Sequence, residues 1–428
     1  MGDSITHCGH YHSYIWLFYM TRFPEMRLQM INAGLGGECS WDMLERLQSD
    51  VFDRNPDYVT LTFGMNDTGY FDVFASPDSS ALSAERISRS LESFHKMEGR
   101  LAQAPNMNVV MIGGSPYDES SKFNDFTIHG KNNAMRAVIS EQKAAAQRHG
   151  WGFVDFHEPM IELSLREQEK DSTFSFCRLE RVHPDCDGQM VMAYLFLKAQ
   201  GLAGSKVADI SLRAGRKKPL RSENCTISNI SGGKDGISFD YLAKSLPYPL
   251  DTIAQNGWGN KKSARDAMGI VPFMEEFNQE QLQVEGLAEG SYRLAIDGQE
   301  IAVFSQTELA GGVNLAEYVN TPQYRQATAV MYLNEDRLLT ERRLLEYLWV
   351  EYEYLRKAGM LYQDDQKAVD YLNEIAKKDF FLSASMNWWK QGIYPEVRKT
   401  WSDNLKNLED TIHSMNKPVS HRISIEKI

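Results

Sequence analysis

The first 203 residues alternate short apolar runs with longer segments of helical periodicity. The apolar runs are rich in β-branched and aromatic residues and end at a turn, a pattern typical of buried strands. They span residues 26–32, 57–63, 108–113 and 152–156. The helical segments span residues 41–55, 83–104, 132–149 and 188–201. The alternation predicts an α/β fold, a parallel sheet with crossover helices on both faces.

The composition changes after residue 203. Residues 204–221 are basic and polar, which predicts a linker. Residues 222–318 have β character, with the clearest hairpin signal around Asp297-Gly298, so they predict a small β-rich subdomain. Residues 319–428 are helical in pattern, and we expect this C-terminal region to pack on the α/β body because no long heptad repeat is sustained.

Charge and composition exclude several classes of protein. Lys and Arg number 46 against 58 Asp and Glu, which gives a net charge of −12 and argues against binding to nucleic acid. No apolar run approaches the ~18 residues of a membrane span. The 5 cysteines include no CxxC pair, so neither a disulfide scaffold nor a zinc module is indicated. Oligomeric state is left open.

The chain begins in an unusual way. The sequence Gly2-Asp3-Ser4 reads as the turn that ends a strand, yet no strand precedes it. We therefore expect the first strand of residues 1–203 to lie upstream of Met1, together with any export signal, so the compartment stays open and a secreted or periplasmic protein is compatible with the sequence. The alternative is that Met1 is the true start and that another element fills the central position of the sheet.

Two motifs supply a nucleophile and a base. Ser4 lies on a glycine turn at the carboxyl end of the expected sheet, where helix amides can stabilise negative charge near its oxygen. His183 precedes a proline in the loop before the last helix and can take the serine proton. Glu180, three residues earlier, can orient the imidazole and stabilise its protonated form. Taken singly, Gly-Asp-Ser and His-Pro are more often ordinary turns.

Two further motifs supply hydrogen-bond donors. Gly37 belongs to a glycine-rich turn that follows the expected strand 26–32, and its free N–H can donate to an oxyanion. Asn66 follows the expected strand 57–63 and offers its side-chain amide to the same oxyanion. Asp67 can fix this loop by accepting backbone N–H groups. A flexible turn and a helix cap are the ordinary readings of these two motifs. Because three of the four motifs follow predicted or implied strands at one edge of the sheet, where sites form in open α/β sheets, the combination indicates a catalytic site.

The order of the motifs resembles the SGNH (GDSL-type) hydrolase family over residues 1–203. The resemblance implies a flavodoxin-like three-layer α/β/α sandwich and a serine esterase that needs no cofactor and no metal. It assigns Ser4 as nucleophile, with Asp3 beside it, and His183 as base. It also assigns an oxyanion hole made by the N–H groups of Ser4 and Gly37 and by the Asn66 amide. The family has Asp three residues before the histidine, where this chain has Glu180.

The expected reaction is hydrolysis of a carboxylic ester through an acyl-enzyme. The appended modules and the lack of a hydrophobic lid favour a short acyl group, such as acetyl, on a carbohydrate. The expected partner is accordingly a small-molecule or carbohydrate ester substrate. One alternative is a lipid-type acyl hydrolase, which would need an apolar groove beside Ser4. Another is a catalytically silent member that binds glycans or partners through the C-terminal region.

Three other clusters carry alternatives. His7, His10 and His12 lie close to Ser4 without a carboxylate pattern, so we expect first-helix residues rather than metal ligands. Cys177 and Cys186 bracket the His183 loop; a disulfide in an exported protein and two buried thiols both stay open. Trp388, Trp389 and Tyr394 could stack on a sugar, but aromatic residues in a helical segment are more often core.

Overall fold

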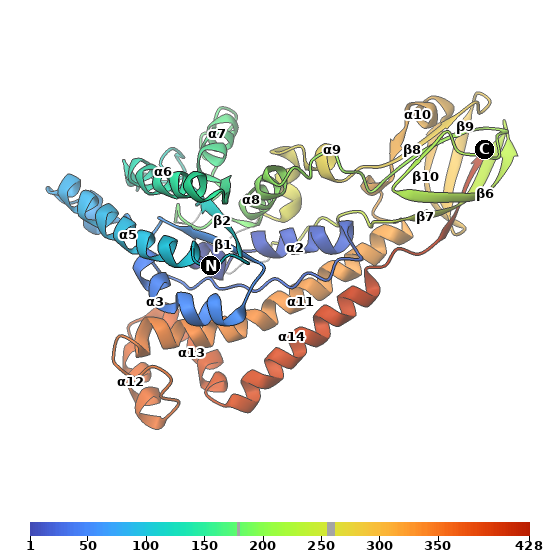
Figure 1. Cartoon of the computed structure of the whole chain (residues 1–428). Coiled ribbons are helices and arrows are strands. Elements are labelled where there is room, and N and C mark those ends of the chain that lie inside the picture. The colour runs from blue at the N-terminus through green and yellow to red at the C-terminus, as the bar shows by residue number, and fades with distance from the viewer. Residues whose placement is uncertain (178–179, 255–261) are drawn as a thin grey trace.

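The structure is a computed structural model that describes residues 1–177, 180–254 and 262–428 (Figure 1). The helices of the first half are α1 (Ser4–His7), α2 (Tyr11–Arg22), α3 (Ser40–Asp50), α4 (Phe71–Phe74), α5 (Ser79–Leu101), α6 (Lys131–His149), α7 (His157–Gln168) and α8 (Cys186–Ala199). Those of the second half are α9 (Phe273–Phe277), α10 (Gln306–Gly311), α11 (Pro322–Val350), α12 (Gln366–Ala376), α13 (Phe380–Gly392) and α14 (Pro395–Met415). The strands of the first half are β1 (Tyr58–Phe63), β2 (Asn108–Gly113) and β3 (Gly152–Asp155).

Strands β1, β2 and β3 form a parallel sheet in that order, and the start of the chain extends it. The Met1 amino group donates to the Thr60 carbonyl at 2.8 Å, and Gly2 forms a parallel bridge with Gly34. Only glycine fits at position 2, because a Cβ there would lie 2.3 Å from Thr6 Oγ1. The carboxyl ends of these segments therefore meet at one edge of the sheet.

The strand predicted at 26–32 is wrong. Those residues have no regular secondary structure, and only Gly34, just beyond them, bridges to the sheet. Their neighbour in the sheet is the short segment Met1-Gly2, which supplies backbone groups for a single bridge. A run of apolar residues pairs as a strand only where a partner edge is present along its length.

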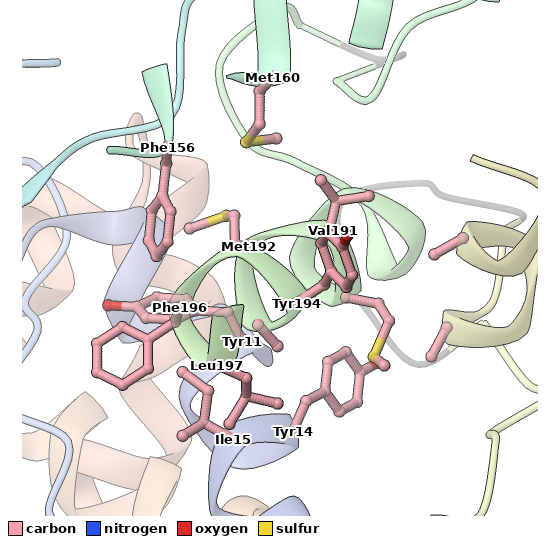
Figure 2. Packing of buried hydrophobic residues seen from close by; sticks show 14 of the residues in the cluster. Tyr11, Tyr14, Ile15, Phe156, Met160, Val191, Met192, Tyr194, Phe196 and Leu197 are labelled. Carbon is pink, nitrogen blue, oxygen red and sulfur yellow. The ribbon is translucent and has the colours of Figure 1, made fainter. Parts of the chain in front are cut away.

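Helices cover both faces of the sheet, so the predicted three-layer α/β/α sandwich with a parallel sheet is confirmed. On one face, Leu61 and Met111 pack with α3 and α5. On the other face, Ile112 and Val154 pack with α2 and α8. Figure 2 shows side chains from α2 and α8 converging in this second core, together with Phe156 and Met160.

A β-sandwich lies at one end of the molecule (Figure 1). Its strands are β4 (Ala208–Arg213), β5 (Arg221–Glu223), β6 (Cys225–Gly233), β7 (Gly236–Ala243), β8 (Glu280–Glu285), β9 (Ser291–Ile296), β10 (Gln299–Ser305), β11 (Val313–Asn314) and β12 (His421–Lys427). They form one sheet in the order β10-β9-β12-β7-β6 and another in the order β11-β8-β4-β5, and the two sheets share one apolar core. The predicted hairpin around Asp297-Gly298 is β9–β10.

The sandwich departs from two sequence expectations. Residues 208–213, predicted as part of a linker at 204–221, form β4, because Ile210 and Leu212 alternate with polar residues and are fully buried. Residues 421–427, predicted as part of the helical region 319–428, form β12 in the middle of the five-stranded sheet. The predicted division of the chain otherwise stays a prediction, with segments 1–203, 204–221, 222–318 and 319–428.

The C-terminal helices pack along the α/β body, as expected. Helix α11 runs beside α2, and α14 returns antiparallel to α11 (Figure 1). The Asn334 amide of α11 donates to Ser13 Oγ of α2 at 2.9 Å. Trp389 of α13 is fully buried and Tyr394 is 57% exposed, so the aromatic cluster is split between core and surface. Among the described residues, no helix is both long and apolar enough to cross a bilayer.

Candidate active site

Ser4, His183 and Glu180 form a hydrogen-bonded chain. Ser4 Oγ lies 2.7 Å from His183 Nε2, and His183 Nδ1 lies 2.7 Å from Glu180 Oε1. The same Glu180 oxygen accepts the His183 backbone N–H at 2.8 Å, which fixes the carboxylate against the loop. The serine hydroxyl thus faces one ring nitrogen while the carboxylate binds the other, an arrangement that can pass a proton from the hydroxyl to the imidazole.

Asp3 begins the short helix that carries Ser4. Its Oδ1 accepts the Ile5 N–H at 2.9 Å and caps α1. The carboxyl is buried, and this burial raises the pKa of Asp3 to about 6, while the nearby His183 opposes the rise. Asp3 therefore shapes the turn and adds a titratable group beside the Ser4–His183 pair.

The loop that carries Glu180 and His183 is anchored by Arg181. This residue has a left-handed φ of 69°, and its buried guanidinium donates to the carbonyl groups of Asp118, Ser121, Asn124 and Phe126. Its own carbonyl accepts the Asp118 N–H at 2.9 Å. Arginine satisfies several carbonyl groups at once because its planar head carries five N–H donors. The sequence motif contained Arg181, but nothing in the pattern indicated this anchoring role.

Gly37 and Asn66 lie on two loops that meet near Glu38. Gly37 is exposed and has a left-handed φ of 80°. Within the described ranges, neither its N–H nor that of Ser4 has a hydrogen-bond acceptor. Asn66 Nδ2 donates to the Glu38 carbonyl at 3.0 Å, and Asn66 Oδ1 accepts from the Tyr70 hydroxyl at 2.9 Å. These two bonds orient the amide and use one of its two N–H groups, which leaves the other to donate.

Asp67 ties the Asn66 loop to its surroundings. Its fully buried carboxylate accepts the N–H groups of Ser40 and Gly64, each at 2.9 Å, and the Ser90 hydroxyl at 2.6 Å. The loop is thereby joined to α3 and α5, which limits the freedom of the Asn66 amide.

Lys131 supports the same loop from α6, and no motif in the sequence pointed to it. Its fully buried ammonium donates to the Met65 and Gly69 carbonyl groups and lies 4.0 Å from the Tyr70 ring centre. Burial lowers the pKa of Lys131 to about 7. Because Lys131 holds the segment on both sides of Asn66, it belongs to the support of the site although it contacts no proposed reacting atom.

The histidines near Ser4 are buried in the body. Burial lowers the pKa of His7 to about 3 and that of His10 to about 4, so both rings are neutral near pH 7. His12 Nε2 lies 3.2 Å from the Thr6 carbonyl. In the part of the chain that the structure describes, no group of three His, Cys, Asp or Glu side chains is arranged to hold a metal ion. Among the residues that the structure describes, Cys177 and Cys186, like the other cysteines, form no disulfide.

A shallow surface depression adjoins the serine. It is lined by Ser4, Ile5, Cys8, Gly9, His10, His183, Pro184 and Gln189. Ile5, Cys8 and Pro184 are its few apolar side chains. The lining is therefore mixed in polarity rather than an apolar groove.

Two family models match the chain. Residues 1–191 match the GDSL-like lipase/acylhydrolase family, and residues 328–417 match the diltiazem deacetylase C-terminal helical domain. The solved structure of a gut microbial diltiazem-metabolizing enzyme is similar over the whole length. It is 43% identical, covers 100% of this chain and 96% of that chain, and has a TM-score of 0.95.

Acetylxylan esterases match the first half. The enzyme of Geobacillus stearothermophilus is 23% identical over 226 residues, which are 47% of this chain and 92% of that protein. A solved structure of an acetylxylan esterase from the same organism covers 47% of this chain and 91% of that chain, at 22% identity and a TM-score of 0.37.

Proposed function

This chain belongs to the GDSL-like lipase/acylhydrolase family and hydrolyses ester bonds, and on that premise we propose that Ser4 removes short acyl groups, acetyl above all, from small-molecule or carbohydrate esters. The observation that carries the proposal is the chain of two 2.7 Å contacts from Ser4 Oγ through His183 to Glu180. It supplies a nucleophile, a base and an orienting carboxylate in contact with one another.

The first half-reaction forms the acyl-enzyme. His183 Nε2 takes the Ser4 proton as Ser4 Oγ bonds to the ester carbonyl carbon, and the carbonyl electron pair moves onto the oxygen. The N–H groups of Ser4 and Gly37 and the free N–H of Asn66 stabilise that oxyanion. When the tetrahedral intermediate collapses, the bond to the alcohol oxygen breaks and protonated His183 gives its proton to the leaving alcohol.

The second half-reaction releases the acid. His183, neutral again, takes a proton from water, and the hydroxide formed in the same step bonds to the acyl carbon. The same donors hold the second oxyanion, and its collapse breaks the bond to Ser4 Oγ, which recovers the proton from His183. Glu180 stays ionised throughout and stabilises the protonated imidazole. Water is the only co-reactant.

Acetyl as the acyl group rests on the relatives and on the polarity of the site. The C-terminal match is to a domain of a diltiazem deacetylase, and the first half is similar to an acetylxylan esterase. Both names describe removal of acetyl groups from those proteins' own substrates. The mixed polarity of the depression beside Ser4 also favours a short acyl group over a long alkyl chain.

The test compares chain length and nucleophile together. Wild type, Ser4→Ala and the surface control Ser140→Ala are assayed with p-nitrophenyl acetate, p-nitrophenyl octanoate and a peracetylated xyloside. We expect kcat/KM to favour acetate over octanoate, activity to disappear in Ser4→Ala, and Ser140→Ala to match wild type. If the enzyme hydrolyses p-nitrophenyl acetate but not the xyloside, the alcohol part of its natural ester substrate is not a carbohydrate. A preference for octanoate, or activity that survives Ser4→Ala, would contradict the proposal.

A further inference from the structure

Helix α11 reaches across the molecule to the glycine-rich loop that carries Gly37. Near its C-terminal end, Trp349 Nε1 donates to the Gly36 carbonyl at 3.0 Å. The carbonyl of Gly36 and the N–H of Gly37 belong to the same peptide unit. In a trans peptide the C=O and N–H bonds point in opposite directions, so a bond that holds the oxygen on one side directs the N–H to the other.

This peptide needs such a constraint. It joins two glycines, and Gly37 already has a left-handed φ of 80° with nothing within 4 Å of where its Cβ would lie. On the Gly37 side, neighbouring side chains therefore do little to prevent the Gly36–Gly37 peptide from turning over, and on the Gly36 side the nearest side chains are those of Trp349 and His7. A turned peptide would present a carbonyl oxygen where the proposed oxyanion needs a donor.

Other contacts hold the same loop to α1 and to α11. The Gly36 N–H donates to His7 Nδ1 at 3.2 Å, which fits a buried and neutral His7. The Asn32 N–H donates to Glu341 Oε1 at 2.9 Å, and Leu35 packs against Leu345. Of these contacts, only the Trp349 bond acts on the peptide unit that contains the Gly37 N–H.

We propose that Trp349 is a positioning residue of the ester-hydrolysing site, which locks the Gly36–Gly37 peptide with its N–H available to the oxyanion. The inference rests on the proposed function for its catalytic consequence, but the lock itself is a structural claim. It gives the C-terminal helical region a part in the reaction, because a residue 312 positions after Gly37 fixes a donor of the site. The bond to the carbonyl also polarises the peptide and strengthens its N–H as a donor.

Two tryptophan variants separate positioning from folding. Trp349→Phe removes the indole N–H and keeps an aromatic ring. Trp389→Phe is the matched control: it removes an indole N–H that donates to Glu351 Oε1 at 2.8 Å, inside the buried cluster against which Trp349 packs, so it tests whether loosening that cluster alone affects the loop. For Trp349→Phe we expect kcat for the acetyl ester to fall roughly tenfold with KM within about twofold, less than the loss of a whole oxyanion donor. For Trp389→Phe we expect a lower Tm and an unchanged kcat.

Amide hydrogen exchange gives a readout that does not depend on turnover. In Trp349→Phe, peptides covering residues 33–39 should exchange faster than in wild type, while peptides covering β2 stay the same; Trp389→Phe should not show this pattern. Wild-type kcat together with wild-type exchange in Trp349→Phe would overturn the inference. So would faster exchange with unchanged kcat, because the lock would then have no effect on the reaction. A wild-type protein inactive on every ester would contradict the proposed function instead, and exchange alone would then decide whether the lock exists.

Discussion

Glu180 binds His183 twice, which makes the longer carboxylate a good substitute for the aspartate found in the family at this place. One oxygen accepts from both the ring Nδ1 and the backbone N–H, at 2.7 and 2.8 Å. The side chain bends back on its own loop, so its extra methylene does not displace the oxygen from the imidazole. The Arg181 anchor holds the loop in the left-handed turn that permits this.

Replacing Glu180 with glutamine should therefore impair chemistry far more than binding. The amide keeps the shape but loses the charge that stabilises protonated His183, and it can present N–H where the ring needs an acceptor. We expect kcat to fall by about four orders of magnitude with little change in KM, by comparison with serine-protease triads. Steady-state kinetics on p-nitrophenyl acetate measure this. Glu158→Gln, at a surface ion pair with Arg136, is the control and should match wild type.

His12 should make folding sensitive to acid. Burial lowers the pKa of His12 from 6.5 to about 3, so below pH 6.5 the unfolded chain binds a proton that the folded chain does not. The free energy of unfolding then falls as pH falls, by about 1.4 kcal/mol per pH unit for one such group, and the contribution is absent above pH 6.5.

The His12→Gln variant lacks this proton uptake. Between pH 7 and pH 5 the wild type should lose about 2 kcal/mol more stability than the variant, measured by urea unfolding at each pH. Comparing the two proteins cancels the carboxyl groups with raised pKa values, such as Asp3, whose effect has the opposite sign. The exposed His95→Gln should parallel wild type, and so would His12→Gln if His12 were protonated in the folded state.

At the scale of elements, β12 holds the sandwich together. It lies between β9 and β7 and pairs with both, although the rest of the C-terminal region is helical. Ile423 and Ile425 point into the shared core and are fully buried. Strand β12 thus completes a sheet whose other strands, β6, β7, β9 and β10, lie more than 100 residues earlier in the sequence.

Replacing Ile425 with a smaller side chain tests whether β12 stabilises the sandwich. Ile425→Ala should lower the free energy of unfolding by about 2–5 kcal/mol, the usual range for a large-to-small change in a packed core. Ser424→Ala, one residue away on the opposite face, should change it by less than about 0.5 kcal/mol. Guanidinium unfolding followed by circular dichroism measures both. Equal effects would mean that β12 does not pack as described.

Local pattern was sufficient where an element's partners lie close in the chain. The strand at 108–113 and the helix at 132–149 were predicted almost to the residue, because apolar periodicity and glycine turns mark them. The pattern failed where pairing is distant: β12 reads as the tail of a helical region, and β4 is obscured by the basic residues after it. For the same reason the motifs identified Ser4 and His183 as candidates, whereas Trp349, far along the chain, carried no signal.

The whole molecule is built so that the α/β body depends on the C-terminal helices. Helix α2 is buried on nearly every side, as expected of a helix enclosed within a protein rather than lying at its surface. Arg337 of α11 lies 4.7 Å from the Trp16 ring centre, and Asn416, just after α14, donates to the Met20 carbonyl at 2.8 Å. Val330 and Ile412 join the same core as α2 and α8.

Residues 1–203 should therefore not survive as an active fragment. Without α11 and α14, the outer side of α2, including the fully buried Trp16, would face water as a large apolar patch. Limited proteolysis of the full chain, followed by mass spectrometry and an acetyl-ester assay of the products, should show activity decaying together with the intact α11–α14 segment. Recovery of a stable fragment ending near residue 203 with wild-type kcat would contradict this dependence. It would also remove any need for Trp349, since that fragment lacks the indole that holds Gly36.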